Sequence, residues 1–437
     1  MNVKNKKSIW TENITLPSFE ELHGEKKTDV LIIGGGLCGI LCAYFLKQAG
    51  VDYILLEAGK IASGITKNTT AKITFQHGLI YDKLLHKFGY NKAQQYLGAN
   101  RDALAEYEAM CKNIDCDFEK KDAYIYSTKN SEILKDETEA VNSLGFSAEF
   151  CKKTELPFEV KGAVRFPNQA QFNPLKFIAA ISKDLNIYEN TFIRDITPSS
   201  AVSAKGKVTA NKIIVTTHFP FINKHGSYFL KLYQHRSYVS AFENATELSC
   251  MYVDEDLKGL SFRTYKNLLL IGGGSHRTGK HGGSWTELKI YAKKYYPDSK
   301  LKYSWATQDC MSLDSIPYIG RYSARTPNLY TATGFNKWGF TSSMAAAKIL
   351  CDMVQDKKND FEDVFSPQRS ILKPQLFVNG FEAVVNLLTP TMRRCPHLGC
   401  SLKWNKVEHT WDCPCHGSRF EQSGRLIDNP STGDANI

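Results

Sequence analysis

The sequence predicts an α/β fold with a Rossmann-type nucleotide-binding unit near the N-terminus and a small separate domain at the C-terminal end. A strand, a glycine-rich turn, a helix and a second strand follow one another between residues 29 and 57. Four of the 12 cysteines are crowded between Cys395 and Cys415. A chain of 437 residues has room for two or three domains.

The glycine-rich turn has the spacing of a dinucleotide-binding motif. Residues 29–33 are typical of a buried strand, and they lead directly into a G-x-G-x-x-G pattern. Residues 40–48 have the pattern of a helix closed by Gly50, and residues 51–56 that of a strand ending at Glu57. Because strand, glycines, helix and acid coincide, we expect a nucleotide site here rather than a structural loop.

Each part of this unit has a physical task. The first glycine permits the tight turn, the second lets the backbone approach a pyrophosphate, and the third lets the helix pack on the strand. Glu57 can accept hydrogen bonds from a ribose hydroxyl. The expected cofactor contacts of this unit are Gly34, Gly36, Leu37, Gly39, Glu57 and Ala58.

The segment after Glu57 decides between NAD and FAD. Residues 58–64 (AGKIASG) and 66–72 (TKNTTAK) resemble the flavin-contacting loop of the D-amino-acid oxidase/glycine oxidase superfamily. Small hydroxyl and amide side chains suit a planar ring and phosphates, although such a run alone is equally typical of a plain polar loop. The resemblance implies FAD as the cofactor, with the contacts Thr66, Asn68, Thr69 and Thr70.

Further segments resemble the same superfamily, in the same order along the chain. They are residues 162–174, 210–218, 313–320 and 334–341. The last of them leads into a predicted helix at residues 342–354, whose N-terminus can point at the electron-rich carbonyl edge of a flavin. The contacts that these segments imply are Thr216, Thr217, Gly334, Lys337, Trp338, Gly339 and Phe340.

The superfamily resemblance also implies a division into domains. It implies an α/β FAD-binding Rossmann-type domain combined with an α+β substrate domain, as in D-amino-acid oxidase, within residues 29–370. The FAD-binding segments are expected at about residues 29–88, 152–225 and 312–366, and the substrate domain at about residues 89–151 and 226–311.

A second glycine cluster, Gly272–Gly274, follows a strand pattern at residues 268–271. It lacks the G-x-G-x-x-G spacing, and the next helix pattern starts only near Trp285. We therefore expect a turn in the substrate domain rather than an NAD site, which argues against direct NAD(P)H oxidation.

The C-terminal cysteines belong to two short loops that each carry cysteine and histidine. The chain reads C-P-H-L-G-C from Cys395 and C-P-C-H-G-S from Cys413. A Rieske [2Fe–2S] centre has two cysteine thiolates on one iron and two histidines on the other, so each loop must supply one of each kind. Structural zinc also accepts two cysteines and two histidines, but zinc fingers pair like with like. The predicted ligands are Cys395, His397, Cys413 and His416.

The C-terminal stretch resembles the Rieske family as far as Asn429–Ser431, which implies a small all-β domain at residues 371–437. Before the first ligand there is little room for supporting strands. The base of this domain is therefore expected to be smaller than usual or to pack against the flavin domain. In quinol-oxidising Rieske proteins, the positions of Cys400 and Cys415 carry a disulfide. The alternative is two free buried thiols, since disulfides are unusual in cytosolic proteins. A bridge closed around a cluster is local and shielded, so the resemblance implies a Cys400–Cys415 disulfide.

Composition limits the partners that can be expected. The formal net charge is +10, but the basic residues are scattered rather than gathered into one block, so no nucleic acid partner is expected. Docking of an acidic redox partner is equally compatible with this charge. No apolar run approaches the roughly 20 residues that a membrane span needs. The N-terminal stretch MNVKNKKSIW is not followed by an apolar segment, so no signal peptide and a cytoplasmic location are expected.

The superfamily resemblance implies that FAD oxidises a small organic substrate, by default an amine or amino acid. Relatives hold the substrate carboxylate with basic residues at positions that align with Thr341 and Phe75, which cannot do so. Cys310 is offset from the position of covalent flavin attachment in some relatives, so non-covalent FAD is expected. Alternative anchors, which are otherwise solvated surface cations, are Lys72, Arg236, Arg277 and Lys337.

No catalytic residue is selected by the sequence. The histidines that could act as a base, but that no spacing distinguishes, are His77, His218, His235 and His276.

Three functions are compatible with these cofactors. The leading one is a dehydrogenase that passes electrons from FAD to the cluster and on to an external acceptor. In the second, a ferredoxin-like donor reduces the cluster and FADH₂ reduces a substrate. The third is a redox sensor or electron carrier without turnover. The sequence does not identify the substrate, the acceptor or the oligomeric state.

Overall fold

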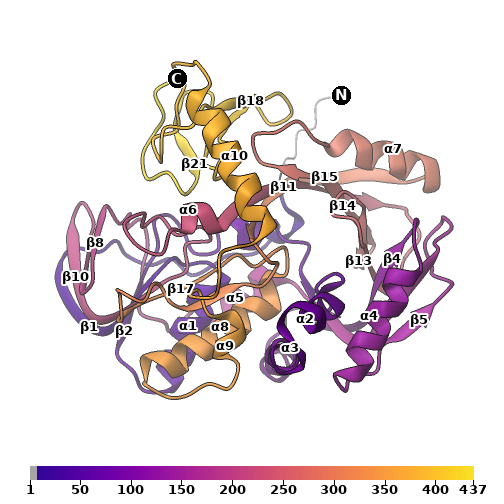
Figure 1. Ribbon diagram of the computed structural model, residues 1–437, viewed down its shortest axis with the longest axis horizontal. Helices are drawn as coiled ribbons and strands as arrows, with labels where there is room; N and C mark the ends of the chain where they lie inside the picture. Colours follow the sequence, from indigo (N-terminus) through magenta and orange to yellow (C-terminus); the bar gives the residue numbers. More distant parts are fainter. Residues whose placement is uncertain (1–6) are drawn as a thin grey trace.

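The computed structural model describes residues 7–437 and arranges them around three sheets (Figure 1). The first sheet has the strand order β16-β17-β10-β1-β2-β7, and β9 and β8 extend it beside β10. Its strands are β1 (Gly24–Ile33), β2 (Tyr53–Leu56), β7 (Ile187–Tyr188), β8 (Asp195–Thr197), β9 (Ser200–Val202), β10 (Gly206–Val215), β16 (Tyr318–Arg321) and β17 (Leu329–Thr333).

The centre of the first sheet is parallel, because β1 pairs in parallel with both β10 and β2. The end of β1 reads Val30–Ile33 and is buried on both faces, as a central parallel strand requires. The chain then turns through glycines into α1 (Leu37–Gln48), which packs against α8 (Gly339–Val354). The α/β Rossmann-type part of the predicted fold class is thereby confirmed.

The second sheet has the order β15-β11-β14-β13-β12-β4-β6-β3, with β5 beside β6. Its long antiparallel strands β11, β14 and β15 are paired along most of their length. Its strands are β3 (Lys72–Ile73), β4 (Glu119–Ser127), β5 (Glu149–Cys151), β6 (Gly162–Gln171), β11 (Leu232–Glu243), β12 (Met251–Asp254), β13 (Ser261–Tyr265), β14 (Leu268–Arg277) and β15 (Lys300–Ser312).

The helices cover these two sheets and link them. Besides α1 and α8 they are α2 (Ile80–Phe88), α3 (Tyr90–Cys111), α4 (Glu132–Ser143), α5 (Pro174–Ile181), α6 (Tyr228–Lys231), α7 (Trp285–Tyr295), α9 (Glu362–Phe365) and α10 (Pro374–Leu388). Within residues 7–437, no helix is both long and apolar enough to cross a membrane.

The turn expected at Gly272–Gly274 is wrong, because β14 continues through these glycines to Arg277. Gly272 pairs with Val239 of β11 on one side and with Ser261 of β13 on the other. A Cβ on Gly272 would lie 2.6 Å from Ser261 Oγ, so glycine is needed for close side-chain approach rather than for a turn.

The third sheet lies in the C-terminal segment, residues 371–437, and has the antiparallel order β18-β19-β20-β21. In Figure 1 this sheet is yellow and lies above β11 and α6, while α10 is orange and runs downwards from it across the front of the molecule. Helix α10 occupies the stretch before the first ligand loop, where little room for strands was expected. The strands are β18 (Lys403–Asn405), β19 (Thr410–Asp412), β20 (Arg419–Phe420) and β21 (Leu426–Asp428).

Candidate functional site: a nucleotide cavity beside two cysteine-histidine loops

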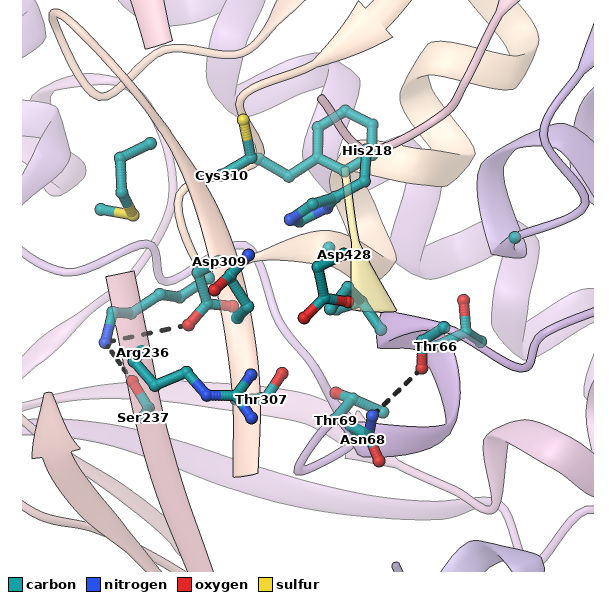
Figure 2. A pocket seen from close by; sticks show the side chains of 18 of the residues that line it. Thr66, Asn68, Thr69, His218, Arg236, Ser237, Thr307, Asp309, Cys310 and Asp428 are labelled. Carbon is teal, nitrogen blue, oxygen red and sulfur yellow. Dashed lines mark hydrogen bonds and ion pairs between the residues drawn. The ribbon is translucent and has the colours of Figure 1, made fainter. Parts of the chain in front are cut away.

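A cavity of about 1680 Å³ opens at the carboxyl end of β1. Its walls come from the glycine turn, from strands β11, β14 and β15 of the second sheet, and from the C-terminal segment. Figure 2 shows His218, Asp309 and Asp428 facing the same space from three separate parts of the chain. The volume suits a large cofactor together with a small substrate.

The glycine turn leaves room where a pyrophosphate would lie. Gly34 has φ +112°, and a Cβ there would lie 2.8 Å from the carbonyl oxygen of Thr216. A Cβ on Gly39 would lie 1.9 Å from Gly34 O, which accounts for the close helix packing. A Cβ on Gly36, in contrast, would meet only Thr66 Oγ1, at 3.6 Å. Gly36 has no side chain to cap α1, and of the first N–H groups of the helix Leu37 N donates to Thr66 Oγ1 at 3.1 Å. This end of α1 therefore fits an anionic phosphate.

Glu57 is fixed at the end of β2 by two backbone N–H groups. Its Oε2 accepts from Gly35 N at 2.7 Å and its Oε1 from Gly59 N at 2.8 Å. Burial raises the pKa of this carboxyl, against the effect of those donors. Each oxygen keeps a further acceptor site, so the group is held in place to accept a ribose hydroxyl.

The loop at residues 66–71 is fixed by side chains that sequence reasoning missed. They come from distant parts of the chain and donate to successive backbone carbonyls, and no local motif marks them. The donors are Trp10 to Thr69 (2.7 Å), Trp305 to Asn68 (2.9 Å), and Arg263 to Thr70 (2.7 Å) and Ala71 (2.6 Å).

The cavity gathers nearly all the residues expected to contact a nucleotide cofactor. Gly39 and Gly334 are not among its lining residues; Gly39 packs α1 on β1, and Gly334 makes a turn with φ +71°. Thr216 Oγ1 donates to Gly34 O at 3.0 Å and so ties β10 to the glycine turn. The expected residues that line the cavity are Gly34, Gly36, Leu37, Glu57, Ala58, Thr66, Asn68, Thr69, Thr70, Thr216, Thr217, Lys337, Trp338, Gly339 and Phe340.

Two lysines present amines to this cavity. Lys337 Nζ donates to Ser275 Oγ at 2.7 Å and to Ser237 Oγ at 3.0 Å, and burial lowers its pKa. The side-chain amine of Lys72, on β3, has no hydrogen-bond or ion-pair partner within the described residues 7–437, whereas its backbone pairs with Gln171. Burial, assisted by the charge of Arg263, lowers the pKa of Lys72 to about 7.

The sequence left open that the four candidate anchors are solvated surface cations, and this alternative is wrong. Lys72 and Lys337 line the cavity. Arg236 is buried and donates from Nε to Glu408 Oε1 at 2.7 Å. Arg277 donates to backbone carbonyls of the second ligand loop, Pro414 O at 2.9 Å and Cys415 O at 3.1 Å. Both arginines therefore hold the C-terminal segment and are not available as simple substrate anchors.

The structure distinguishes the histidines that the sequence could not. His77 contacts Tyr96 OH through Nδ1 (2.6 Å) and Thr341 Oγ1 through Nε2 (2.9 Å), and burial lowers its pKa to about 3. His218 lines the cavity, and its Nε2 has no hydrogen-bond partner within residues 7–437. Burial lowers the pKa of His218 also, so its ring is neutral and can accept a proton. His235 and His276 do not line the cavity.

Cys310 lines the cavity but is a poor nucleophile. Burial raises the pKa of its thiol to about 12, and its Sγ lies 3.6 Å from Thr333 Oγ1. A protonated, buried thiol agrees with the expectation of non-covalent FAD.

The two ligand loops have the same backbone geometry. Cys395 N donates to Cys400 O at 2.8 Å, and Cys413 N donates to Ser418 O at 2.8 Å. Glycines with positive φ close both turns, +79° at Gly399 and +84° at Gly417. The loops therefore present their cysteine and histidine side chains in equivalent ways.

The four predicted ligands form two like pairs. Cys413 interacts with Cys395 as a hydrogen-bonding thiol and so lowers the pKa of Cys395. His397 Nδ1 and His416 Nδ1 lie 3.3 Å apart. Burial lowers the pKa of His397 to about 4 and that of His416 to about 3, so both imidazoles are in the neutral form that binds metal. Two sulfurs together and two nitrogens together fit a Rieske [2Fe–2S] cluster.

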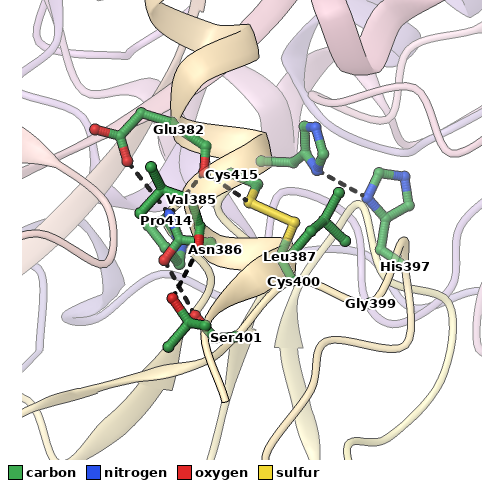
Figure 3. Close-up of a disulfide and its surroundings, with 12 residues drawn as sticks. Glu382, Val385, Asn386, Leu387, His397, Gly399, Cys400, Ser401, Pro414 and Cys415 are labelled. Atoms are coloured by element: carbon green, nitrogen blue, oxygen red, sulfur yellow. Dashed lines mark hydrogen bonds between the residues drawn. A yellow bond between two sulfur atoms is a disulfide. The ribbon is translucent and has the colours of Figure 1, made fainter. Parts of the chain in front are cut away.

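The expected disulfide between Cys400 and Cys415 is present and joins the two loops (Figure 3). Its sulfurs and the Cys413 sulfur all lie within 4.8 Å of one another. The bridge is therefore packed directly against a ligand.

Both ligand loops are held on the rest of the molecule by side-chain amides. Gln234 Nε2 donates to His416 O at 2.8 Å, and Gln308 Nε2 donates to Gly417 O at 2.9 Å. Asn223 Oδ1 lies 2.9 Å from His397 Nε2. Sequence reasoning missed these three residues, because nothing in their own segments distinguishes them.

A buried ion-pair network adds to this contact. Glu408 pairs with Arg236 of β11 and with Arg419 of β20, whose guanidinium also reaches Asp412 and Asp428. Burial pushes the pKa of Glu408 upwards, but the two arginines more than offset this and hold it at about 2.

Comparison with known proteins assigns both parts of the chain. The family model for FAD dependent oxidoreductases matches residues 29–353, and the model for the Rieske [2Fe-2S] domain matches residues 386–436. YhfW of Bacillus subtilis (strain 168), whose name describes a Rieske 2Fe-2S iron-sulfur protein, is 34% identical over 97% of this chain and 96% of its own length.

More distant proteins match the first part of the chain. Gamma-glutamylputrescine oxidoreductase of Escherichia coli (strain K12) is 23% identical over 79% of this chain and 87% of its own length. The crystal structure of glycine oxidase from Geobacillus kaustophilus has a TM-score of 0.66 at 19% identity, covering 80% of this chain and all (100%) of that one. The similarity to the glycine oxidase structure shows a shared fold.

Proposed function

Because the chain belongs to the FAD dependent oxidoreductase family and carries a Rieske [2Fe-2S] domain, we propose that it is a dehydrogenase of a small amine or amino acid. FAD, when bound, takes two electrons from the substrate, and the cluster passes electrons singly to an external acceptor. The predicted residues of the cavity would hold FAD, and Cys395, His397, Cys413 and His416 would hold the cluster.

The position of Gln308 is the observation that supports this proposal most directly. Its side chain lines the cavity, and its amide donates to Gly417 O beside the ligand His416. One side chain therefore separates the cavity from a ligand loop. Gln234, which accepts from Gln308 at 2.8 Å, makes a second such contact through His416 O. This arrangement favours electron exchange within one chain over exchange between separate proteins.

The polar groups of the cavity suit a substrate with an amine and an anionic group. The Lys72 amine has no competing partner among residues 7–437 and can bind a carboxylate, while Asp309, near Lys337, can bind an ammonium group. His218 Nε2 can accept a proton from the substrate nitrogen. The names of two similar proteins, a gamma-glutamylputrescine oxidoreductase and a glycine oxidase, point to the same substrate class.

A screen of amines and amino acids under anaerobic conditions tests this function. We expect at least one compound to bleach the flavin absorption of the holoenzyme and to support steady turnover with an artificial one-electron acceptor. A protein that functions only as a sensor or carrier would give no turnover with any compound. If the cluster instead feeds electrons to FAD, no candidate amine would bleach the flavin, whereas a reduced ferredoxin would reduce both centres.

A further inference from the structure

Helix α10 has its polar side chains turned towards the protein and its apolar side chains turned outwards. The inward residues recur at helical spacing, and Asn379 and Asn386 are buried. Asn379 accepts from Arg277 Nη1 at 2.9 Å, and Asn386 Oδ1 accepts from Ser401 Oγ at 3.1 Å. The hydrogen bonds thus fix the helix in this orientation.

The outward face of α10 is a continuous apolar stripe. Phe377 is 71% exposed, Phe381 69% and Leu388 76%, and the stripe continues past the helix to Met392. Over 15 residues the helix is about 22 Å long, so the stripe runs over four turns. Exposed apolar surface of this extent marks an interaction site rather than ordinary surface. Its members are Leu372, Phe377, Val378, Phe381, Val384, Val385, Leu387, Leu388 and Met392.

Cations stand at both ends of this stripe. Lys373 precedes the helix, and Arg393 and Arg394 follow it. Glu382 is the only acidic residue between positions 371 and 394, and it pairs with Lys280 at 2.7 Å on the inner side. Lys373 Nζ lies over the Phe88 ring at 4.8 Å and the Arg393 guanidinium over the Trp411 ring at 4.6 Å, so both charges flank the stripe. The outward face between them carries no carboxylate.

We propose that α10 docks on an anionic lipid bilayer, lying in the plane of the interface with its apolar stripe among the acyl chains. The helix is too short to span the roughly 30 Å hydrocarbon core, whereas an apolar stripe flanked by basic residues is what interfacial helices use. Lys373 and the exposed Arg393, at the two ends of the stripe, complement anionic headgroups.

The same charges disfavour a second copy of the chain as the occupant. If two copies packed α10 against α10 in antiparallel fashion, Lys373 of one would face Arg393 and Arg394 of the other. A parallel arrangement brings like ends together as well. With Glu382 held inwards, neither arrangement supplies a carboxylate to offset this repulsion.

Docking through α10 would also bring the first ligand loop to the membrane surface. Arg394 donates to Leu387 O at the end of the helix (3.1 Å) and to Gly399 O in the loop (2.8 Å), so the two segments are joined. Figure 3 shows Leu387 and Gly399 side by side at the disulfide.

Co-sedimentation of the holoenzyme with lipid vesicles tests the proposal. We expect binding to equimolar phosphatidylglycerol and phosphatidylcholine vesicles and much weaker binding to phosphatidylcholine alone. The variant Phe377→Glu/Phe381→Glu should bind the anionic vesicles at least about tenfold less, because two apolar anchors are replaced by charge. Both side chains are exposed, so the variant should retain its flavin and cluster absorption.

Single substitutions provide a matched control. Phe381→Glu should weaken vesicle binding, whereas Ile290→Glu should leave it unchanged, since Ile290 is a 64% exposed apolar residue on α7. The proposal is overturned if the wild type does not bind anionic vesicles, or if Phe381→Glu and Ile290→Glu behave alike. It is equally overturned if the wild type is a dimer in sedimentation equilibrium that Phe377→Glu/Phe381→Glu separates, without vesicle binding.

Discussion

Arg236 on strand β11 and Glu408 in the Rieske domain form a buried ion pair, with Arg236 Nε 2.7 Å from Glu408 Oε1. Both residues line the cavity, so the pair connects the Rieske domain to the cavity wall. Its energetic importance depends on both partners remaining charged, because removing one would leave the other buried and unpaired.

The Glu408→Gln variant tests this pair through its pH dependence. The folded-state pKa of about 2 lies below the ordinary value of 4.5, so the pair stabilises the fold above pH 4.5 and loses this contribution as pH falls towards 2. We expect the variant to be less stable than the wild type by about 3 kcal/mol at neutral pH. Urea unfolding followed by circular dichroism should show this difference shrinking between pH 4.5 and pH 3.

Gly279→Ala tests the contact between the second sheet and the second ligand loop. Gly279 has φ +76°, and an added Cβ would lie 2.6 Å from Pro414 N, so the loop that carries Cys413 must move. We expect cluster reduction by the flavin to slow at least about tenfold in rapid mixing. Gly50→Ala is the control: its φ is +69°, but its Cβ meets nothing within 4 Å. Equal slowing in both variants would contradict the assigned contact.

Gly36→Ala tests the expected pyrophosphate site. The new methyl group would meet only Thr66 Oγ1, at 3.6 Å, so the protein should fold, but the methyl group would occupy space that the pyrophosphate needs. We expect FAD affinity to fall at least about tenfold in equilibrium dialysis. Gly380→Ala on α10, where a Cβ also has open space, should retain FAD. If Gly36→Ala binds FAD with unchanged affinity, Gly36 does not contact the pyrophosphate.

Lys72 gives a prediction on substrate binding. With a pKa of about 7, its amine is charged below that pH and neutral above it, so the affinity for a small carboxylate such as acetate should fall as pH rises from 6 to 8. Flavin difference spectra of the holoenzyme would measure this affinity. Lys72→Arg should bind acetate without this pH dependence, and Lys72→Met should bind it about tenfold more weakly. Unchanged affinity in Lys72→Met would exclude this anchor.

The disulfide is open to direct measurement. Denaturation with alkylating reagent but without reductant should leave Cys400 and Cys415 unmodified, while reduction beforehand should add two labels to the intact mass. Labelling of both cysteines without reductant would show that the bridge is absent in the purified protein.

The parts of the fold that the sequence predicts correctly are those specified by short local patterns. The strand at residues 29–33 and the glycine turn need few neighbours, and each ligand loop is closed by its own glycine, Gly399 or Gly417. Gly272 shows the limit of such patterns. Its conformation is decided by cross-strand partners on β11 and β13, which the local sequence does not identify.

The residues that assemble the site could not be predicted in the same way. Arg263 and Trp305 hold the loop at residues 66–71 from across the second sheet, and Gln234 and Gln308 hold the ligand loops. Each is an ordinary polar or aromatic residue in its own strand. Its role follows only from tertiary packing.

Anaerobic rapid mixing of the oxidised holoenzyme with a substrate amine tests the central claim most directly. The contact between Gln308 and Gly417 predicts that flavin bleaching comes first and that cluster reduction follows within the same molecule, at a rate independent of protein concentration. The account is contradicted if the flavin is reduced while the cluster stays oxidised, or if cluster reduction depends on protein concentration.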